Sequence, residues 1–312
     1  MKLKKIGKKL IPLLTVAFTV LVLYFLYQVF SKIEWEKVAQ SMKEISMGTL
    51  AISLVLVFLN YLILSNYDYI GFRYFKIPKI NYLKASITAM ISYAFNFNLG
   101  ALIGGLGFRI RMYSGWGVAK KSTTLVALLS VGTTWLGFVM LGSILILFGE
   151  NWMPGPVREQ ASTLKVLAAC GLSVVGVYFY LCFRRKVITI KQKATLMPPI
   201  RYAFLQSFLA LCQWNIAASV AYLFLIEMNV DISYAHTLFT FLAASLGGVI
   251  ARIPSGMGVL EAIFLKLNQG LPSSSVLAAI ICFRITYYII PLAAAIPSYL
   301  ILEIYQKKLQ NK

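Results

Sequence analysis

The sequence predicts an all-α polytopic membrane protein, and three observations support that fold class. Of the 312 residues, 59% are hydrophobic and only 13% are charged, and the mean hydropathy is +0.77. The apolar residues gather in runs of about 20, the length at which a helix that rises about 1.5 Å per residue crosses a bilayer. These runs are too long for the strands of a membrane β-barrel and lack their alternation.

Six full spans follow one another along the chain. The first, 11–30, comes after a basic start and resembles a signal peptide, but it is too long and no small-residue cleavage site follows it. We therefore expect it to remain as a span. The other five lie near 49–67, 122–148, 163–183, 202–226 and 275–302. The chain is then a single integral membrane domain, 1–312.

Two further apolar stretches, 85–103 and 236–251, run into glycine-rich breaks. If both enter the membrane and return on the same side, 22 of the 30 Lys and Arg lie in cytoplasmic segments and 7 of the 10 Asp and Glu lie outside. If both cross, the six-cation loop 184–201 faces outward. We therefore expect six full spans plus two re-entrant broken-helix hairpins, eight membrane segments in all, with both termini cytoplasmic. Eight full spans is the alternative.

The two breaks match each other at an offset of 151 residues. The expected break residues are Gly104, Gly105 and Gly107 in the first, and Pro254, Gly256 and Gly258 in the second. The same offset superimposes the spans, so the chain divides into repeats of about 11–148 and 162–299. Each repeat has three full spans, an odd number, so the second is inverted relative to the first. Inverted repeats with broken helices are a transporter plan, in which the breaks lie at the binding site.

Charged residues follow both breaks. Arg109 and Arg111 follow the first, and Glu261, which follows the second, maps between them at the same offset. Ionisable groups at membrane depth are costly and are candidates for function. We expect these side chains to face one shared cavity, where arginine would suit a phosphate. Arg252 and Arg284 would complete the site, and Asp68 is a weaker candidate. The alternative is that the charges only pair to fix the packing of the hairpins.

Two other segments receive a structural interpretation. In 31–48, Trp35, Val38 and Met42 lie at helical spacing, which predicts an interfacial helix. The basic run 184–193 is interpreted as a topology signal, with binding of anionic headgroups as the alternative.

No enzymatic site is expected. The four cysteines lie in apolar runs without metal-ligand spacing, and His236 is the only histidine. Catalytic signatures and a nucleotide fingerprint are missing, so neither a cofactor nor a metal is predicted. The net charge of +20 is explained by Lys and Arg in cytoplasmic loops, so binding of nucleic acid is not predicted.

At these same residues the chain resembles the transmembrane region of lysylphosphatidylglycerol synthase/flippase proteins, and in particular the stand-alone YbhN-type bacterial membrane proteins. The matching pieces are Tyr67-Asp68-Tyr69 with Gly71, Tyr93-Ala94-Phe95-Asn96, 104–109, Thr134-Trp135-Leu136-Gly137, 253–261, and Phe283-Arg284 with Tyr287, Tyr288 and Pro291. Ser255 departs from the family's Pro-Gly-Gly-x-Gly-x-x-Glu hallmark at a glycine, and it still permits a tight turn.

The resemblance implies a multi-pass protein of the bacterial cytoplasmic membrane whose partners are phospholipids. In the multidomain relatives, the membrane region moves aminoacylated phospholipid between leaflets, and a separate soluble domain performs the transfer reaction. The sequence stops at Lys312, so we do not expect synthase activity. By similarity, Arg109 or Arg111, Glu261 and Asp68 would matter to translocation.

Three functions remain open at this point. The first is a flippase-like lipid translocator for a phospholipid or aminoacyl-phospholipid headgroup. The second is a secondary transporter of a small anionic solute, which an enclosed cavity would favour. The third is a non-transporting partner of a phospholipid-synthesis enzyme, which mutually paired, dry charges would favour.

Overall fold

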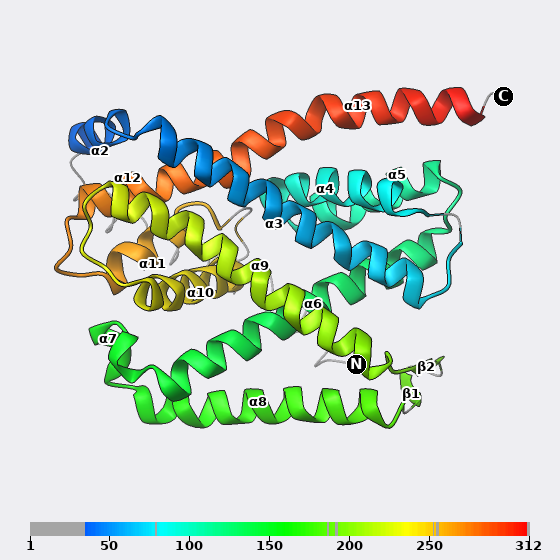
Figure 1. Ribbon diagram of the computed structural model, residues 1–312, viewed down its shortest axis with the longest axis horizontal. Helices are drawn as coiled ribbons and strands as arrows, with labels where there is room; N and C mark the ends of the chain where they lie inside the picture. The colour runs from blue at the N-terminus through cyan, green and yellow to red at the C-terminus, as the bar shows by residue number, and fades with distance from the viewer. Residues whose placement is uncertain are drawn as a thin grey trace, which may run out of the picture.

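Long helices that run between two ends of the molecule make up most of the computed structural model (Figure 1). It describes residues 35–78, 80–185, 187–190, 193–251, 253 and 256–310. The first half contains α2 (Trp35–Lys43), α3 (Met47–Tyr74), α4 (Tyr82–Leu99), the π-helix η1 (Ala101–Gly107), α5 (Phe108–Gly115), α6 (Lys120–Phe148) and the short η2 (Glu150–Trp152) and α7 (Gly155–Arg158). The second half contains α8 (Ala161–Phe183), β1 (Val187–Ile190), β2 (Lys193–Leu196), α9 (Ile200–Glu227), α10 (Tyr234–Ala251), α11 (Val259–Leu267), α12 (Ser273–Arg284), the π-helix η4 (Ile285–Ile289) and α13 (Ile290–Gln310).

Six stretches within the described residues are long and apolar enough to cross a membrane, which confirms the all-α polytopic fold class. They are Met47–Tyr74, Lys120–Phe148, Ala161–Phe183, Ile200–Glu227, Tyr234–Ala251 and Ser273–Leu309. The sequence predicts 236–251 as one arm of a hairpin, and the length of the observed helix, Tyr234–Ala251, also suits a full span. The expected first span, 11–30, lies outside the described residues. The predicted loop 184–201 contains a small antiparallel hairpin of the strands β1 and β2. Val187-Ile188-Thr189-Ile190 is a run of β-branched residues, which favour strands.

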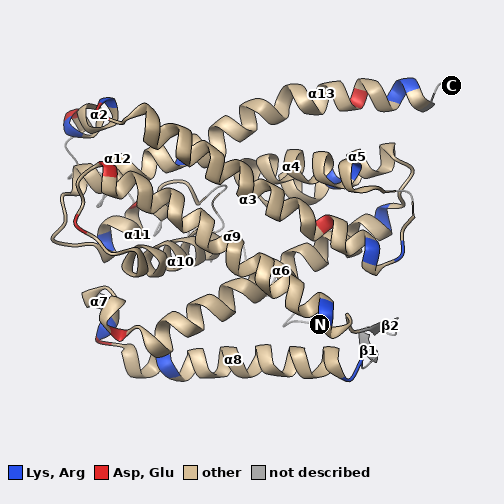
Figure 2. Ribbon diagram, viewed as in Figure 1, with Lys and Arg blue, Asp and Glu red and all other residues tan. Residues whose placement is uncertain are grey.

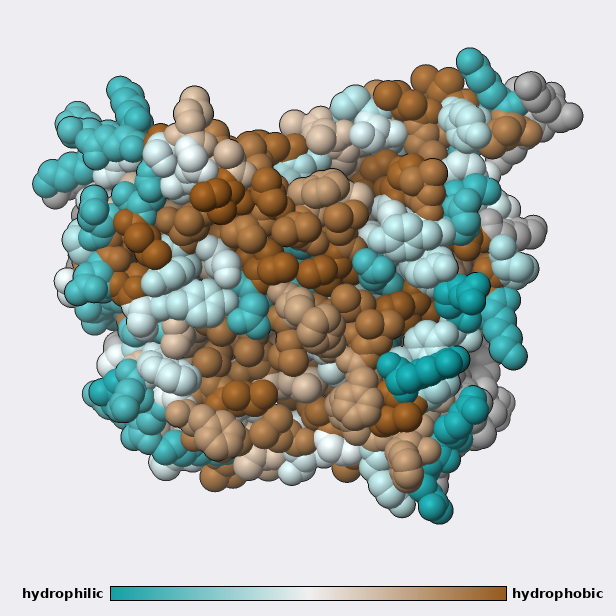
Figure 3. Space-filling model, in the orientation of Figure 1, coloured by the Kyte–Doolittle hydropathy of each residue, from teal (hydrophilic) through white to brown (hydrophobic). Residues whose placement is uncertain are grey.

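An apolar belt separates the two ends of the molecule. The face seen in Figure 3 has a broad hydrophobic band across its middle, with hydrophilic side chains gathered at the left and right. Lys and Arg dominate the right-hand end, where α5 ends and α13 finishes, whereas the end with α2 and α7 carries both signs (Figure 2). This is the distribution that the positive-inside rule leads one to expect of a membrane bundle.

Two helical hairpins lie inside the bundle. One consists of α4, η1 and α5, and the other of α10 and α11; in each, the arms pack side by side, and the chain enters and leaves at one end of the molecule (Figure 1). The first hairpin turns at Gly100, where φ is 83°. The second resumes its helix after Gly258, where φ is 79°. Such angles favour glycine. The re-entrant path of both hairpins in a membrane stays a prediction.

The first break lies four residues before its expected position. Gly104, Gly105 and Gly107 do not interrupt the helix; they form part of η1, which continues directly into α5. The glycines instead permit close packing, since a Cβ on Gly104 would lie 2.1 Å from the carbonyl oxygen of Phe95. In the second hairpin, Gly256 and Gly258 do lie between helices, and Pro254 is outside the described residues.

The element boundaries support the predicted inverted repeat. The offset of 151 takes the starts of α3, α4, α5 and α6 to residues 198, 233, 259 and 271, and α9, α10, α11 and α12 start at residues 200, 234, 259 and 273. Equivalent helices also have equivalent neighbours, because α3 packs on α4 and α6 while α9 packs on α10 and α12. The two equivalent helices α3 and α9 pack on each other at the centre (Figure 1). The repeat itself stays a prediction, as does the single-domain organisation.

Candidate functional site

Asp68 is the centre of a buried polar cluster that ties the first hairpin to two long helices. Its side chain is 0% exposed and lies on α3. The carboxylate accepts hydrogen bonds from Arg109 Nε at 2.9 Å and Tyr113 Oη at 3.0 Å, both on α5, and from Ser130 Oγ on α6 at 2.8 Å. A carboxylate buried among apolar helices is tolerated only when it is paired and hydrogen-bonded in this way.

Arg109 keeps part of its guanidinium free. Its Nη1 donates to the carbonyl oxygen of Gly105 at 3.3 Å, and its Cζ lies 4.3 Å from the ring centroid of Tyr93. Its Nη2 is buried and has no hydrogen-bond partner among the described residues. Because a buried donor without a partner is costly, this nitrogen marks a place where a water or a ligand oxygen would be stabilised.

Glu261 and Arg284 form the second buried pair and tie the second hairpin to α12. Their side chains are 7% and 12% exposed. Arg284 Nη2 donates to Glu261 Oε2 at 3.0 Å and to the carbonyl oxygen of Gly256 at 2.8 Å, so it also holds the glycine-rich turn. Glu261 lies in the first turn of α11, where the helix dipole favours a negative charge.

A row of aromatic rings joins the two ion pairs. Arg109 lies over Tyr93, the Tyr93 and Phe97 ring centroids are 6.0 Å apart, and Phe97 stacks on Tyr288 at 5.7 Å. Arg284 Cζ lies 5.5 Å from the centroid of Tyr288. The aromatic faces thus give each cation a second favourable neighbour and connect the two ion pairs through ring contacts between α4 and η4.

Unsatisfied polar atoms gather beside this wall, around Tyr287. Asn60 donates through Nδ2 to the hydroxyl of Tyr287, and Tyr61 Oη donates to its backbone carbonyl at 3.2 Å. Tyr67 and Gln213 also lie close to Tyr287. The buried Asn60 Oδ1, Tyr67 Oη and Gln213 Oε1 have no partner among the described residues. Buried polar atoms usually have hydrogen-bond partners. These three atoms could therefore form hydrogen bonds with a polar ligand in the middle of the bundle.

Arg111 does not belong to either cluster. Its side chain is 65% exposed and its Nη2 donates to Glu303 on α13 at 2.6 Å. Two residues along a helix correspond to about 200° of rotation, so Arg109 and Arg111 point in nearly opposite directions. The expectation that both arginines face one cavity is therefore wrong.

The structure brings together some of the expected residues but in different pairs. Arg109 pairs with Asp68, Arg284 pairs with Glu261, and Glu261 has no ion pair with either arginine of the first hairpin among the described contacts. Asp68, expected to be the weaker candidate, accepts hydrogen bonds from three described side chains. Arg252 lies outside the described residues. Sequence reasoning missed Tyr113 and Ser130, whose only signal is that they are polar residues near or within apolar runs.

The described residues contain no group of three or more His, Cys, Asp or Glu side chains that could hold a metal ion. The four cysteines are free thiols.

Comparison with known proteins assigns the chain to a family. The family described as the lysylphosphatidylglycerol synthase TM region matches residues 13–295. The inner membrane protein YbhN of Escherichia coli (strain K12) is 31% identical over 99% of this chain and 96% of its own length. An uncharacterized protein of Synechocystis is 26% identical over 89% of this chain and 87% of its own.

Larger relatives match over only part of their length. The phosphatidylglycerol lysyltransferase of Staphylococcus aureus (strain MRSA252) is 25% identical over 94% of this chain, which covers 34% of that protein. The chain thus spans about a third of this lysyltransferase, and the family resemblance expected from the sequence is confirmed. This multi-pass membrane protein belongs to the lysylphosphatidylglycerol synthase transmembrane-region family.

Proposed function

We propose that this protein is a lipid translocator of the bacterial inner membrane. It would move the headgroup of a phospholipid or an aminoacyl-phospholipid past the two hairpins while the acyl chains stay in the bilayer. The observation that carries the proposal is Arg109, a buried guanidinium whose Nη2 lacks a partner among the described residues. The open N–H groups of this one nitrogen suit an oxygen atom of a phosphate.

The positions of the two ion pairs support a mechanism. Each pair ties one hairpin to a long helix, through Asp68 and Arg109 in the first and through Glu261 and Arg284 in the second. A phosphate oxygen that accepts from Arg109 Nη2 would draw the guanidinium away from Asp68, which is bound to Nε, and would loosen the first hairpin. Glu261 offers a negative charge that would suit an amine-bearing headgroup. The aromatic row and the unpaired polar atoms around Tyr287 would line the route between the pairs.

The relatives support the lipid class of the substrate. The lysyltransferase relatives are named for phosphatidylglycerol, and the chain matches a part of them. The name of the Escherichia coli relative supports the inner membrane as the location. The proposal takes from them a phospholipid partner and not the transfer reaction, so no enzymatic step is assigned.

A liposome assay tests the proposal. The purified protein is reconstituted with a trace of fluorescent phosphatidylglycerol or lysyl-phosphatidylglycerol, and dithionite quenching of the outer leaflet follows lipid movement. We expect movement above protein-free liposomes. Arg109→Gln and Glu261→Gln should each slow it about tenfold or more, since a hydrogen bond to a charged group contributes roughly 1.5–3 kcal/mol.

Glu303→Gln is the matched control, because it removes an ion pair on the exposed side of α13. It should leave the initial rate within about twofold of the parent, a change that corresponds to less than ~0.5 kcal/mol. Circular dichroism and gel filtration establish that the variants are folded. No movement of any lipid by the folded parent, with and without a proton gradient, would rule out the translocator.

A second function has its own supporting observation. Both buried carboxylates are already paired with arginines, an arrangement that suits a static membrane partner of a phospholipid-synthesis enzyme. That partner would show no lipid movement in the same assay, and Glu261→Gln would change only its stability. A small anionic solute remains the third candidate, and its test is uptake of labelled phosphate or a carboxylate into the same liposomes.

A further inference from the structure

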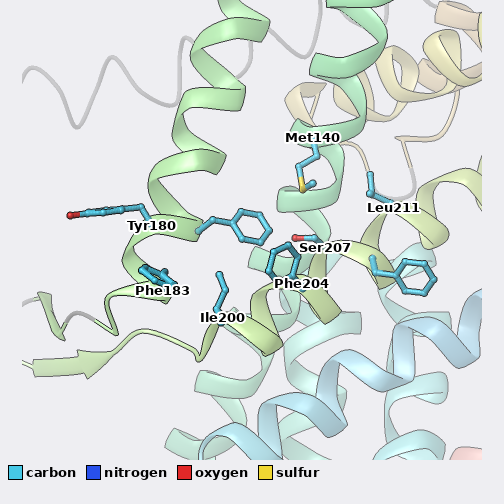
Figure 4. A pocket seen from close by; sticks show the side chains of 9 residues that line it. Met140, Tyr180, Phe183, Ile200, Phe204, Ser207 and Leu211 are labelled. Carbon is cyan, nitrogen blue, oxygen red and sulfur yellow. The ribbon is translucent and has the colours of Figure 1, made fainter.

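An apolar groove lies between α6, α8 and α9, and none of its lining residues belongs to either ion pair (Figure 4). Its volume is about 760 Å³. Side chains from α6, α8 and α9 line it, and these are Met140, Phe179, Tyr180, Phe183, Ile200, Phe204, Ser207, Phe208 and Leu211. Several of the rings are largely exposed, including Phe183, Phe204 and Phe208. The groove is thus a furrow in the apolar belt and not part of the buried core.

The lining suits a hydrocarbon chain. Ser207 is the one lining residue with an aliphatic hydroxyl, and that hydroxyl already donates to the carbonyl oxygen of Ala203 at 2.9 Å. The groove therefore offers a polar solute little beyond the Tyr180 hydroxyl, whereas aromatic and aliphatic walls pack well against methylene groups. A fixed furrow of this kind orders a chain more than a smooth helix surface does.

The length of the groove matches one leaflet. Ile200 lies at one end of the lining and Leu211 towards the other (Figure 4). Eleven residues of helix correspond to about 16 Å, and half of the hydrocarbon core of a bilayer is about 15 Å. The groove starts near the end of the bundle and finishes near the middle of the apolar belt, so its occupant comes from the leaflet at that end.

Arginines come directly after lining residues at one end of the groove. Arg184 follows the lining residue Phe183 at the end of α8, and Arg201 follows the lining residue Ile200 at the start of α9. Arg184, Arg185 and Arg201 are all exposed. None of the three has an ion pair with an acidic side chain among the described residues. Their charges are therefore available to an anionic group bound beside Phe183 and Ile200.

We propose that this groove binds one acyl chain of an anionic glycerophospholipid, whose phosphate lies at Arg184, Arg185 and Arg201. The site is separate from Arg109 and Glu261, and it holds a resident lipid whether or not the protein moves lipids. Arginine is suited to the phosphate because it can donate two parallel N–H bonds. Arg184 and Arg185, which belong to the predicted topology signal, then also serve lipid binding.

Native mass spectrometry of the detergent-solubilised protein tests this site. The protein is titrated with equimolar phosphatidylglycerol and phosphatidylcholine of the same chain length, and the first lipid retained on the monomer is counted. We expect preferential retention of phosphatidylglycerol. The double variant Arg184→Gln/Arg201→Gln should reduce that preference about tenfold to thirtyfold.

Two further variants separate the headgroup from the groove. Lys307→Gln/Lys308→Gln removes the same amount of charge from the end of α13, on the opposite side of the bundle (Figure 1), and should keep the preference. Phe204→Ala/Phe208→Ala alters the groove wall and should lower retention of both lipids. An unchanged preference in the arginine variant, equal losses in both charge variants, or a lipid-free dimer that buries α8 and α9 would overturn the proposal.

Discussion

At the scale of single residues, burial decides what each charge does. The three carboxylates of Asp68, Glu261 and Glu303 all pair with an arginine, but their side chains are 0%, 7% and 23% exposed. Removing one partner of a buried pair leaves an uncompensated charge and costs about 3–5 kcal/mol. An exposed pair contributes about 0–1 kcal/mol, since water already solvates both groups.

Neutralising these carboxylates one at a time should give a graded loss of stability. Asp68→Asn should cost about 3–5 kcal/mol. Glu261→Gln should cost less, because Arg284 keeps its hydrogen bond to the Gly256 carbonyl and some contact with solvent. Glu303→Gln should cost within about 1 kcal/mol. Thermal unfolding in one detergent measures the series, and an order led by Glu303→Gln would contradict it.

Removing both members of the central pair should be less harmful than removing one. In Asp68→Asn the guanidinium of Arg109 is left buried beside neutral groups, whereas in Asp68→Asn/Arg109→Gln no net charge remains to be desolvated. We expect the double variant to unfold at a higher temperature than Asp68→Asn. A double-mutant cycle in the same unfolding assay, with Arg109→Gln as the second single variant, gives the interaction free energy between the two side chains. Strictly additive losses would show that the two groups do not interact.

At the scale of elements, close packing of the first hairpin depends on one glycine more than on its neighbours. A Cβ on Gly104 would lie 2.1 Å from a backbone oxygen of α4, which cannot move without opening the hairpin. A Cβ on Gly107 would meet only the Leu102 carbonyl oxygen at 3.5 Å, an ordinary contact. Both residues look equivalent in the sequence, because the pattern Gly-Gly-x-Gly does not say which glycine faces a neighbouring backbone.

Alanine substitutions should separate these two glycines. Gly104→Ala forces η1 away from α4 and should lower the unfolding temperature strongly, with a cost of about 1–3 kcal/mol or more, typical of overpacking. Gly107→Ala should be neutral or slightly stabilising, because alanine favours helix by about 1 kcal/mol over glycine. Gly132→Ala on α6, where no atom lies within 4 Å of the added Cβ, is the control. Equal losses at positions 104 and 107 would contradict the packing described above.

At the scale of the whole molecule, features that depend on residues close together in the sequence could be predicted. Features that depend on contacts between distant segments could not. The spans come from runs of apolar residues, which the bilayer requires locally, so the long helices agree with the sequence. The offset of 151 comes from chain order and agrees with the helix starts. The partners of Arg109, Arg111 and Glu261 depend on how helices rotate and pack, which no local pattern contains. The three donors to Asp68 illustrate this, since they lie 41 to 62 residues away along the chain.

The path of the chain through the membrane gives the last prediction. Six spans with two hairpins and eight full spans assign opposite sides to every loop between the two hairpins. With hairpins, Lys120 and Arg185 lie in the cytoplasm and Glu159 lies outside; with eight spans, all three are reversed, while Arg73 is cytoplasmic in both. The structure supports the hairpins, because α4 begins and α5 ends at the same cation-rich end of the molecule (Figure 2).

Single cysteines at these four positions, in a background without the native cysteines, can be labelled in intact cells with an impermeant maleimide. We expect labelling at position 159 alone, and labelling at 120 and 185 but not at 159 would establish eight spans.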